Sequence, residues 1–141
     1  MVVKSQLQKR FLSNPLFAVV GASKIESKSG TKVLRWYKNR VFKVQPIHPR
    51  EVELEGIRTI KSLEGLPLPS STSVSIITPP PVTLNILKQA KALGVPYLWL
   101  QPGAEDASVI NFIEENALNV IYGGPCILRD GDEIRHELRN I

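Results

Sequence analysis

Several features that define large classes of proteins are missing from this sequence. Its 141 residues include one cysteine, Cys126, so the chain cannot form an internal disulfide, and a disulfide-stapled secreted fold is excluded. The longest apolar run, residues 16–20, is far shorter than the ~20 residues of a membrane-spanning helix, and we expect no membrane partner. No cluster of metal ligands, Ser/His/Asp set or carboxylate pair occurs at a supporting spacing. The sequence therefore predicts no metal site and no catalytic residues.

What is present describes one folded domain. Hydrophobic residues make up 43% of the chain and charged residues 22%, the balance of an ordinary globular protein rather than a disordered one. Domains cluster near roughly 100–150 residues, and no linker or repeat divides this sequence. We therefore expect residues 1–141 to form a single domain.

Positive charge is concentrated in the first part of the chain. Residues 1–50 hold eleven basic side chains and one acid, whereas residues 51–141 hold seven bases and twelve acids. This imbalance suggests a partner with several negative charges, such as nucleic acid, an anionic membrane or a polyphosphate cofactor. A basic surface that only faces solvent, without an anionic partner, would have the same composition. Arg35 and Lys38, on a predicted helix, are expected to be solvated in this way.

Short apolar segments alternate with helical patterns along the chain. The predicted strands are residues 16–20, 41–47, 73–78, 96–101 and 119–122, with a short further strand at 56–60. The predicted helices are an N-terminal one within residues 1–14, then 32–39, 82–93, which ends at Gly94, and 106–117. Ser29 or Thr31 is expected to cap the second helix, and the charged C-terminal segment 129–141 is expected to be a tail or a short helix.

Strands that alternate with helices of about a dozen residues indicate βαβ units and a parallel sheet. We therefore predict an α/β fold, a Rossmann-like, doubly wound, mostly parallel sheet of about five to six strands with helices on both faces. In such a sheet, ligands bind beyond the carboxyl ends of the strands. Five segments rich in Gly, Pro or small polar residues follow the predicted strands: 21–23, 48–50, 78–80, 101–103 and 124–126. Loops are commonly built from these residues, and this explanation is sufficient for any one segment. It is less satisfactory for five segments that all follow strands of the same sheet.

The segment Gly21-Ala22-Ser23 joins a buried strand to a helix, which is the context of a phosphate site. Glycine allows close approach of the backbone, and the free N–H groups at a helix start attract anions. Residues 28–31 stand at the mouth of this helix and would add donors. The Gly-x-Gly-x-x-Gly and Walker A motifs are both missing, so this segment alone is a weak signal.

The residues His48, Pro49 and Arg50 at the end of the second strand indicate the kind of nucleotide. NAD-binding folds usually place an acid here to hold the ribose 2′-hydroxyl, whereas an arginine suits a ribose that carries a phosphate. NADP has such a phosphate at the 2′ position and coenzyme A at the 3′ position. Alternatively, Arg50 pairs with Glu51 or Glu53 at the surface, where an ion pair contributes little.

Taken in order, these segments resemble a known family. Besides residues 19–23, Gly30 and 44–50, the resemblance rests on 75–80, 94–103 and 124–126, and it covers roughly residues 3–128. The chain is similar to the stand-alone coenzyme A-binding domain proteins, which are related to the N-terminal domain of the succinyl-CoA synthetase alpha subunit. Two positions depart from the family's pattern: His48 stands where members often have asparagine, and the first loop, 24–28, lacks the usual proline.

The resemblance implies a Rossmann-like domain that binds coenzyme A or an acyl-CoA. The phosphates would lie by the first loop and the start of the second helix, the adenosine near residues 48–50 and the pantetheine arm near 78–80. The candidate cofactor-binding residues are Gly21, Ala22, Ser23, Lys28, Ser29, Gly30, Thr31, Ile47, His48, Pro49, Arg50, Thr78, Pro79 and Pro80. The phosphohistidine domain and beta subunit of succinyl-CoA synthetase have no place in 141 residues, so we expect a cofactor-binding protein rather than an enzyme.

Other interpretations remain open at this point. An NADP-dependent oxidoreductase would need a proton donor that the sequence does not identify, and a nucleic-acid-binding module would need an aromatic stacking motif that the basic half lacks. We expect a small-molecule cofactor, no nucleic acid, and a cytoplasmic location, with a mitochondrial one as the alternative because bases precede the first acid. A homo-oligomer is compatible with the sequence. Cys126 is expected either to be a buried structural residue or to approach the pantetheine thiol, and His136 to be solvated.

Overall fold

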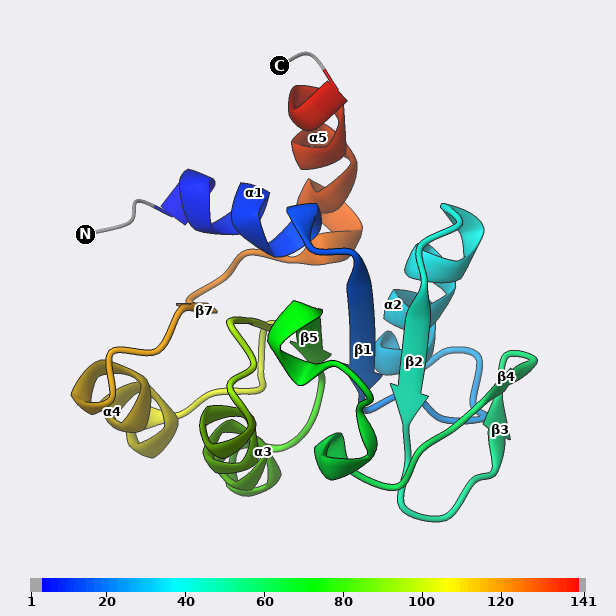
Figure 1. Cartoon of the computed structure of the whole chain (residues 1–141), viewed down its shortest axis with the longest axis horizontal. Coiled ribbons are helices and arrows are strands. Elements are labelled where there is room, and N and C mark those ends of the chain that lie inside the picture. The colour runs from blue at the N-terminus through cyan, green and yellow to red at the C-terminus, as the bar shows by residue number, and fades with distance from the viewer. Residues whose placement is uncertain (1–3, 140–141) are drawn as a thin grey trace.

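The computed structural model describes residues 4–139, which fold around a parallel sheet (Figure 1). Its five strands, in the spatial order β2-β1-β5-β6-β7, are all parallel. Their bounds are β1 (Leu16–Val20), β2 (Val44–Ile47), β5 (Thr72–Ile76), β6 (Tyr97–Leu100) and β7 (Val120–Ile121). The predicted α/β, Rossmann-like fold is confirmed. Pro46 lies in β2, an edge strand, where its missing N–H disrupts no central ladder.

Helices cover both faces of the sheet. They are α1 (Lys4–Ser13), α2 (Ser29–Asn39), α3 (Pro80–Leu93), α4 (Ala107–Glu115) and α5 (Ile127–Arg139). Successive side chains of β1 point to opposite faces, so Phe17 and Val19 pack in a core with α1, α2 and α5, and Ala18 packs in a second core with α3 and α4. Because both faces of β1 are buried, residues 16–20 form one continuous apolar run. Two short 3-10 turns, η1 (Leu63–Gly65) and η2 (Pro69–Ser71), precede β5.

A two-stranded hairpin beside the carboxyl end of β2 replaces the short strand predicted at 56–60 (Figure 1). It consists of β3 (Glu53–Leu54) and β4 (Ile57–Arg58), which are antiparallel. The two turn residues, Glu55 and Gly56, have φ values of 53° and 77°, the positive angles that a tight two-residue hairpin turn requires. Ile60, the last residue of the predicted strand 56–60, pairs with the main sheet through one isolated bridge to Ile47.

Two details at helix starts differ from the prediction. Helix α3 begins at Pro80 rather than at Val82, because proline has no N–H to lose in the first turn of a helix. Neither Ser29 nor Thr31 caps α2: Lys28 occupies the N-cap position and makes no side-chain capping bond. Gly94 ends α3 in the left-handed conformation, as predicted.

The C-terminal segment, expected to be a tail or a short helix, is a helix from residue 127 to residue 139. Ile127 and Ile134 are buried on one side of α5, and Gly131 lies against the ring of Trp36 on α2, leaving no room for a side chain. This packing holds a segment that is otherwise rich in charge. Residues 140–141 of the predicted tail, and residues 1–3 of the predicted N-terminal helix, lie outside the described residues.

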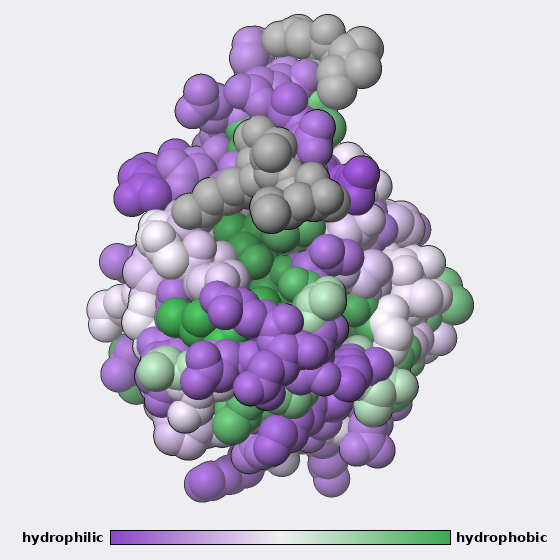
Figure 2. All heavy atoms as spheres, turned by 90° about the vertical axis from the view of Figure 1, so that its left-hand side faces the viewer, coloured by the Kyte–Doolittle hydropathy of each residue, from purple (hydrophilic) through white to green (hydrophobic). Residues whose placement is uncertain are grey.

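One side of the surface has a partly uncovered apolar region. Hydrophobic side chains gather in the middle of the side where the sheet ends at β7, framed by polar ones (Figure 2). Between residues 4 and 139, no helix is both long and apolar enough to span a bilayer, and the longest, α3, has 14 residues.

Candidate functional site

The candidate site lies where the strand order reverses. From β1 the chain moves to β2 on one side, and it then returns past β1 to β5 on the other side. The loops that leave β1 and β5 therefore diverge between these two strands, which is the usual binding position of an open parallel sheet. The backbone N–H of Ile77 donates to the carbonyl of Val20 at 2.8 Å, so the two strand ends are directly adjacent.

Two glycines bring three pieces of backbone into contact at this point. A β carbon on Gly21 would lie 2.0 Å from the carbonyl oxygen of Ile77, and one on Gly30 would lie 2.1 Å from the carbonyl oxygen of Gly21. Gly21 also has a φ of +119°, which side chains disfavour. The first turn of α2 is thus packed directly on the loop that follows β1. Its first N–H groups, which have no acceptor within the helix, lie beside this loop.

The loop after β1 is held in shape by Thr31. The buried Thr31 hydroxyl donates to the carbonyl of Ser23 at 2.9 Å and accepts from the N–H of Ser23 at 3.1 Å. The hydroxyl of Ser23 in turn accepts from the N–H of Ile25 at 3.1 Å. Thr31 therefore shapes the predicted phosphate loop from inside the protein, whereas Lys28 and Ser29 are exposed at its mouth.

His48 organises the turn at the end of β2. Its Nδ1 accepts from the backbone N–H groups of Arg50, at 3.0 Å, and of Glu51, at 2.9 Å. An acceptor Nδ1 places the imidazole proton on Nε2. The side-chain oxygen of asparagine accepts the same kind of hydrogen bond in turns. His48 can therefore stabilise this turn as an asparagine would.

Arg50 does not form the surface ion pair that was the alternative to a ligand role. Glu51 pairs instead with Lys24, at 3.0 Å, and no ion pair within residues 4–139 joins Arg50 to Glu53. Arg50 is exposed and lines a hollow of about 190 Å³ together with His48 and Pro49. Ile47 is 5% exposed and belongs to the core, so its contribution is packing.

The same hollow contains two cations that sequence reasoning missed, Arg58 and Lys61. They belong to the more acidic part of the chain and were not connected with β2. The hairpin places them there, and its two-residue turn at Glu55 and Gly56 was the signal that would have predicted this position.

Arg35 and Lys38, expected to be solvated, tie the hairpin to α2. The guanidinium of Arg35 contacts both oxygens of Glu55, at 2.6 and 3.2 Å, and Glu26 of the first loop at 3.1 Å. Lys38 Nζ donates to the carbonyl of Glu55 at 2.6 Å. The hydrogen bond from Arg35 lowers the pKa of the Glu55 carboxyl and raises the pKa of Arg35. Between first loop and hairpin lies a hollow of about 480 Å³.

The predicted pantetheine segment borders a third hollow, of about 300 Å³. Its walls are residues 77–79 after β5 and 102–104 after β6. The Thr78 hydroxyl is hydrogen-bonded to that of Thr83 at 2.8 Å, and Pro79 has no N–H, so this wall offers few free donors. Pro80 lies in the first turn of α3 and is not part of the wall.

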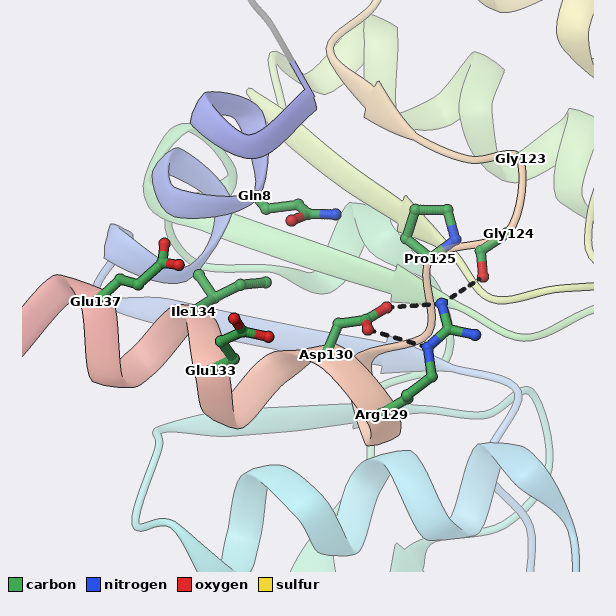
Figure 3. A pocket seen from close by; sticks show the side chains of 9 residues that line it. All are labelled: Gln8, Gly123, Gly124, Pro125, Arg129, Asp130, Glu133, Ile134 and Glu137. Carbon is green, nitrogen blue, oxygen red and sulfur yellow. Dashed lines mark hydrogen bonds and ion pairs between the residues drawn. The ribbon is translucent and has the colours of Figure 1, made fainter.

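The largest hollow, of about 550 Å³, contains none of the predicted residues. It lies between α1, α5 and the segment after β7 (Figure 3). Three carboxylates line it, whereas its one arginine, Arg129, is already bonded to Asp130 and to the carbonyl of Gly124. With three carboxylates and an arginine that is already paired, this hollow is poorly suited to a polyphosphate.

Neither Cys126 nor His136 lines any of the hollows described above. The thiol of Cys126 is half-buried and accepts from the side-chain amide of Gln101 at 3.1 Å. His136 is exposed on α5. Among the residues that the structure describes, no three His, Cys, Asp or Glu side chains are grouped as metal ligands.

A family model covers most of this chain. Residues 16–132 match the model of the CoA binding domain family. The chain belongs to this family. The matched residues include every strand of the sheet and all the candidate residues of the CoA-binding domain, while α1 and the last half of α5 lie outside the match.

Several solved structures of other proteins are similar to this chain. A conserved hypothetical protein from Pyrococcus furiosus is 34% identical, with a TM-score of 0.73, and the match covers 79% of this chain and 94% of that one. A protein from Thermus thermophilus is 24% identical over 94% of this chain and 99% of its own, with a TM-score of 0.79. A hypothetical protein from Pyrococcus horikoshii OT3 is 19% identical over 94% and 92%, with a TM-score of 0.81. The last two show the fold alone, and no curated protein matches the chain.

Proposed function

We propose that this protein binds coenzyme A or an acyl-CoA along the carboxyl edge of its sheet, without a reaction of its own. The observation that carries the proposal is that residues 16–132, which match the CoA binding domain family, include all the loops at this edge. Family membership supports the ligand class, and the reversal of strand order supports the proposed place.

One backbone segment and two hollows along this edge suit three parts of the cofactor. The diphosphate would lie on the backbone at residues 21–23 and the start of α2, where Gly21 and Gly30 leave no side chain in the way. Lys28 and Arg50 would add positive charge from either side. The adenosine would lie against the turn at 48–50, and the pantetheine arm along the apolar wall at 77–79.

The side chains at this edge favour binding over catalysis. His48 is the one histidine here, and its Nδ1 is engaged by two backbone N–H groups. The hydroxyls of Thr31 and Thr78 are likewise bonded within the protein. A cytoplasmic location and assembly into a homo-oligomer stay predictions.

Isothermal titration calorimetry with coenzyme A and acetyl-CoA tests the proposal. We expect saturable heat and a weaker affinity for Arg50→Ala. Lys88→Ala, which removes an exposed lysine of α3, serves as the charge control. No saturable heat with either ligand would overturn the proposal, and a response to NADPH or to a DNA duplex would then favour the corresponding alternative. Mass spectrometry of the ligand retained by the purified protein would identify the acyl group.

A further inference from the structure

Three positive side chains from separate segments converge on the hollow at the end of β2. Arg50 comes from the turn after β2, Arg58 from β4 and Lys61 from the segment that follows. All three side chains are exposed, and none has an ion-pair or hydrogen-bond partner within residues 4–139. Like charges gathered without a counter-charge repel each other, so a ligand anion would be bound favourably here.

Backbone hydrogen bonds hold the segment that carries Arg58, at the end of β4, and Lys61. The N–H of His48 donates to the carbonyl of Ile60 at 2.9 Å, and the N–H of Ile60 donates to the carbonyl of Pro46 at 3.2 Å. The side-chain amide of Gln45 donates to the carbonyl of Arg58 at 2.8 Å. Arg58 and Lys61 therefore flank a segment that is bonded to β2 itself, which limits the entropy lost when they bind a ligand.

The acidic residues nearby do not neutralise this hollow. Glu51, the one carboxylate that lines it, is bound to Lys24 at 3.0 Å. Glu53 lies opposite Arg58 in the hairpin register, but it lines the neighbouring hollow, and no ion pair between the two occurs in the described chain.

We propose that Arg58 and Lys61, together with Arg50, form a subsite for the phosphate on the ribose of the cofactor's adenosine. The hairpin would thus make the protein select coenzyme A over dephospho-coenzyme A. This inference rests on the proposed function and adds the residues that determine specificity. A guanidinium offers two N–H donors in a fork that matches phosphate oxygens, and an ammonium adds a mobile point charge. A ligand without the phosphate leaves the cations unpaired and loses these bonds.

Calorimetry of the full chain with matched ligands tests the subsite. Coenzyme A is compared with dephospho-coenzyme A, and adenosine 3′,5′-bisphosphate with adenosine 5′-monophosphate, all at one ionic strength because such contacts are screened by salt. We expect the 3′-phosphate to improve affinity by about tenfold or more in each pair. The variant Arg58→Gln/Lys61→Gln should lose about tenfold in coenzyme A affinity, with dephospho-coenzyme A unchanged.

A matched control removes the same charge elsewhere. Lys43→Gln/Lys88→Gln changes two exposed lysines, one before β2 and one on α3, and should leave the affinity ratio unchanged. Circular dichroism would verify that both double variants are folded.

The outcomes separate this inference from the proposed function. Equal binding of coenzyme A and dephospho-coenzyme A by the unmodified chain, or an equal loss for both in Arg58→Gln/Lys61→Gln, would overturn the subsite and leave coenzyme A binding intact. The affinity ratio of NADPH to NADH should be smaller than the ratio of coenzyme A to dephospho-coenzyme A. If the two ratios are equal, the subsite does not distinguish a 3′-phosphate from a 2′-phosphate, and its assignment to the 3′-phosphate is wrong. Absence of binding by any coenzyme A form would instead overturn the proposed function.

Discussion

The loop after β1 and the turn after β2 stand at neighbouring strand ends, but different parts of the chain build them. The loop is shaped by backbone: Gly21 and Gly30 bring carbonyl groups so close that a single methyl group would overlap them. The turn is shaped by side chains: His48 holds its backbone, and exposed cations surround the hollow beside it.

This difference separates two requirements of a nucleotide site. A diphosphate needs unobstructed N–H groups, and close packing provides them at the cost of tolerating no substitution. Discrimination among nucleotides needs particular side chains, and these tolerate replacement because they face solvent. We expect substitutions in the loop to act on folding and substitutions around the turn to act on affinity.

The largest effect is expected for Gly30→Ala. Alanine normally stabilises a helix relative to glycine by ~0.5–1 kcal/mol, but here the new methyl group would lie 2.1 Å from the carbonyl oxygen of Gly21. We expect a loss of at least ~2 kcal/mol in the free energy of unfolding, measured by urea denaturation. Gly94→Ala is the control, because Gly94 has a positive φ but no atom within 4 Å of its β carbon. It should cost ~1 kcal/mol. A Gly30→Ala protein as stable as the unmodified chain would contradict the backbone-built loop.

A smaller effect is expected for His48→Ala. The change removes the acceptor of two backbone N–H groups, each bond being worth roughly 0.5–1.5 kcal/mol when water can partly replace it. Coenzyme A affinity should fall several-fold while the fold is retained. His48→Asn should restore most of the affinity, because asparagine also accepts from the N–H two residues on. If His48→Asn binds as weakly as His48→Ala, the imidazole has a role beyond holding the turn.

Acid should loosen the hairpin before it affects the loop. Arg35 lowers the pKa of the Glu55 carboxyl below its ordinary value of 4.5. A carboxyl whose pKa is lower in the folded state stabilises the fold above its unfolded pKa, and this contribution is lost as the pH falls through the folded value. Unfolding measured from pH 7 downward should show less acid sensitivity in Glu55→Gln than in the unmodified chain. Glu64→Gln, at an exposed carboxyl in η1, is the control. Equal acid sensitivity in both variants would show that the Arg35 contact is not coupled to folding.

The smallest effect is expected for Lys24→Gln. This change breaks the ion pair with Glu51, in which the lysine is largely exposed, and exposed pairs contribute ~0–1 kcal/mol. The midpoint of thermal unfolding should shift by little more than the error of the measurement. A large decrease would mean that this ion pair, rather than His48, holds the turn.

Most of the fold follows from local sequence signals. The apolar run at 16–20 indicated a strand buried on both faces, and Gly94 indicated the end of α3. The segments after the strands share one edge of the sheet, which is why the sequence predicts the site there. The C-terminal segment was left open between a tail and a short helix because its charge was conspicuous, although residues 127, 131, 134 and 138 recur at helical spacing.

The rest depends on contacts between distant segments. Arg58 and Lys61 reach the candidate site only because Ile60 bonds to β2 and the hairpin turns back at residues 55–56. The roles of Arg35, Lys38 and Thr31 likewise depend on partners between eight and twenty residues away. Propensity and periodicity describe one segment at a time and do not contain this information.

The hairpin segment also has a consequence for how such a domain can diverge. It leaves the sheet at Pro46 and returns at Ile60, and backbone hydrogen bonds join these two ends. The ends are thus held together whatever the length of the excursion between them, and lengthening a closed loop costs little, about 0.6 kcal/mol per doubling. Insertions, deletions or charge reversals between residues 49 and 59 can therefore accumulate while the five-stranded sheet keeps its register. We therefore expect related proteins to differ in nucleotide preference first through changes in residues 49–59, while the sheet stays the same.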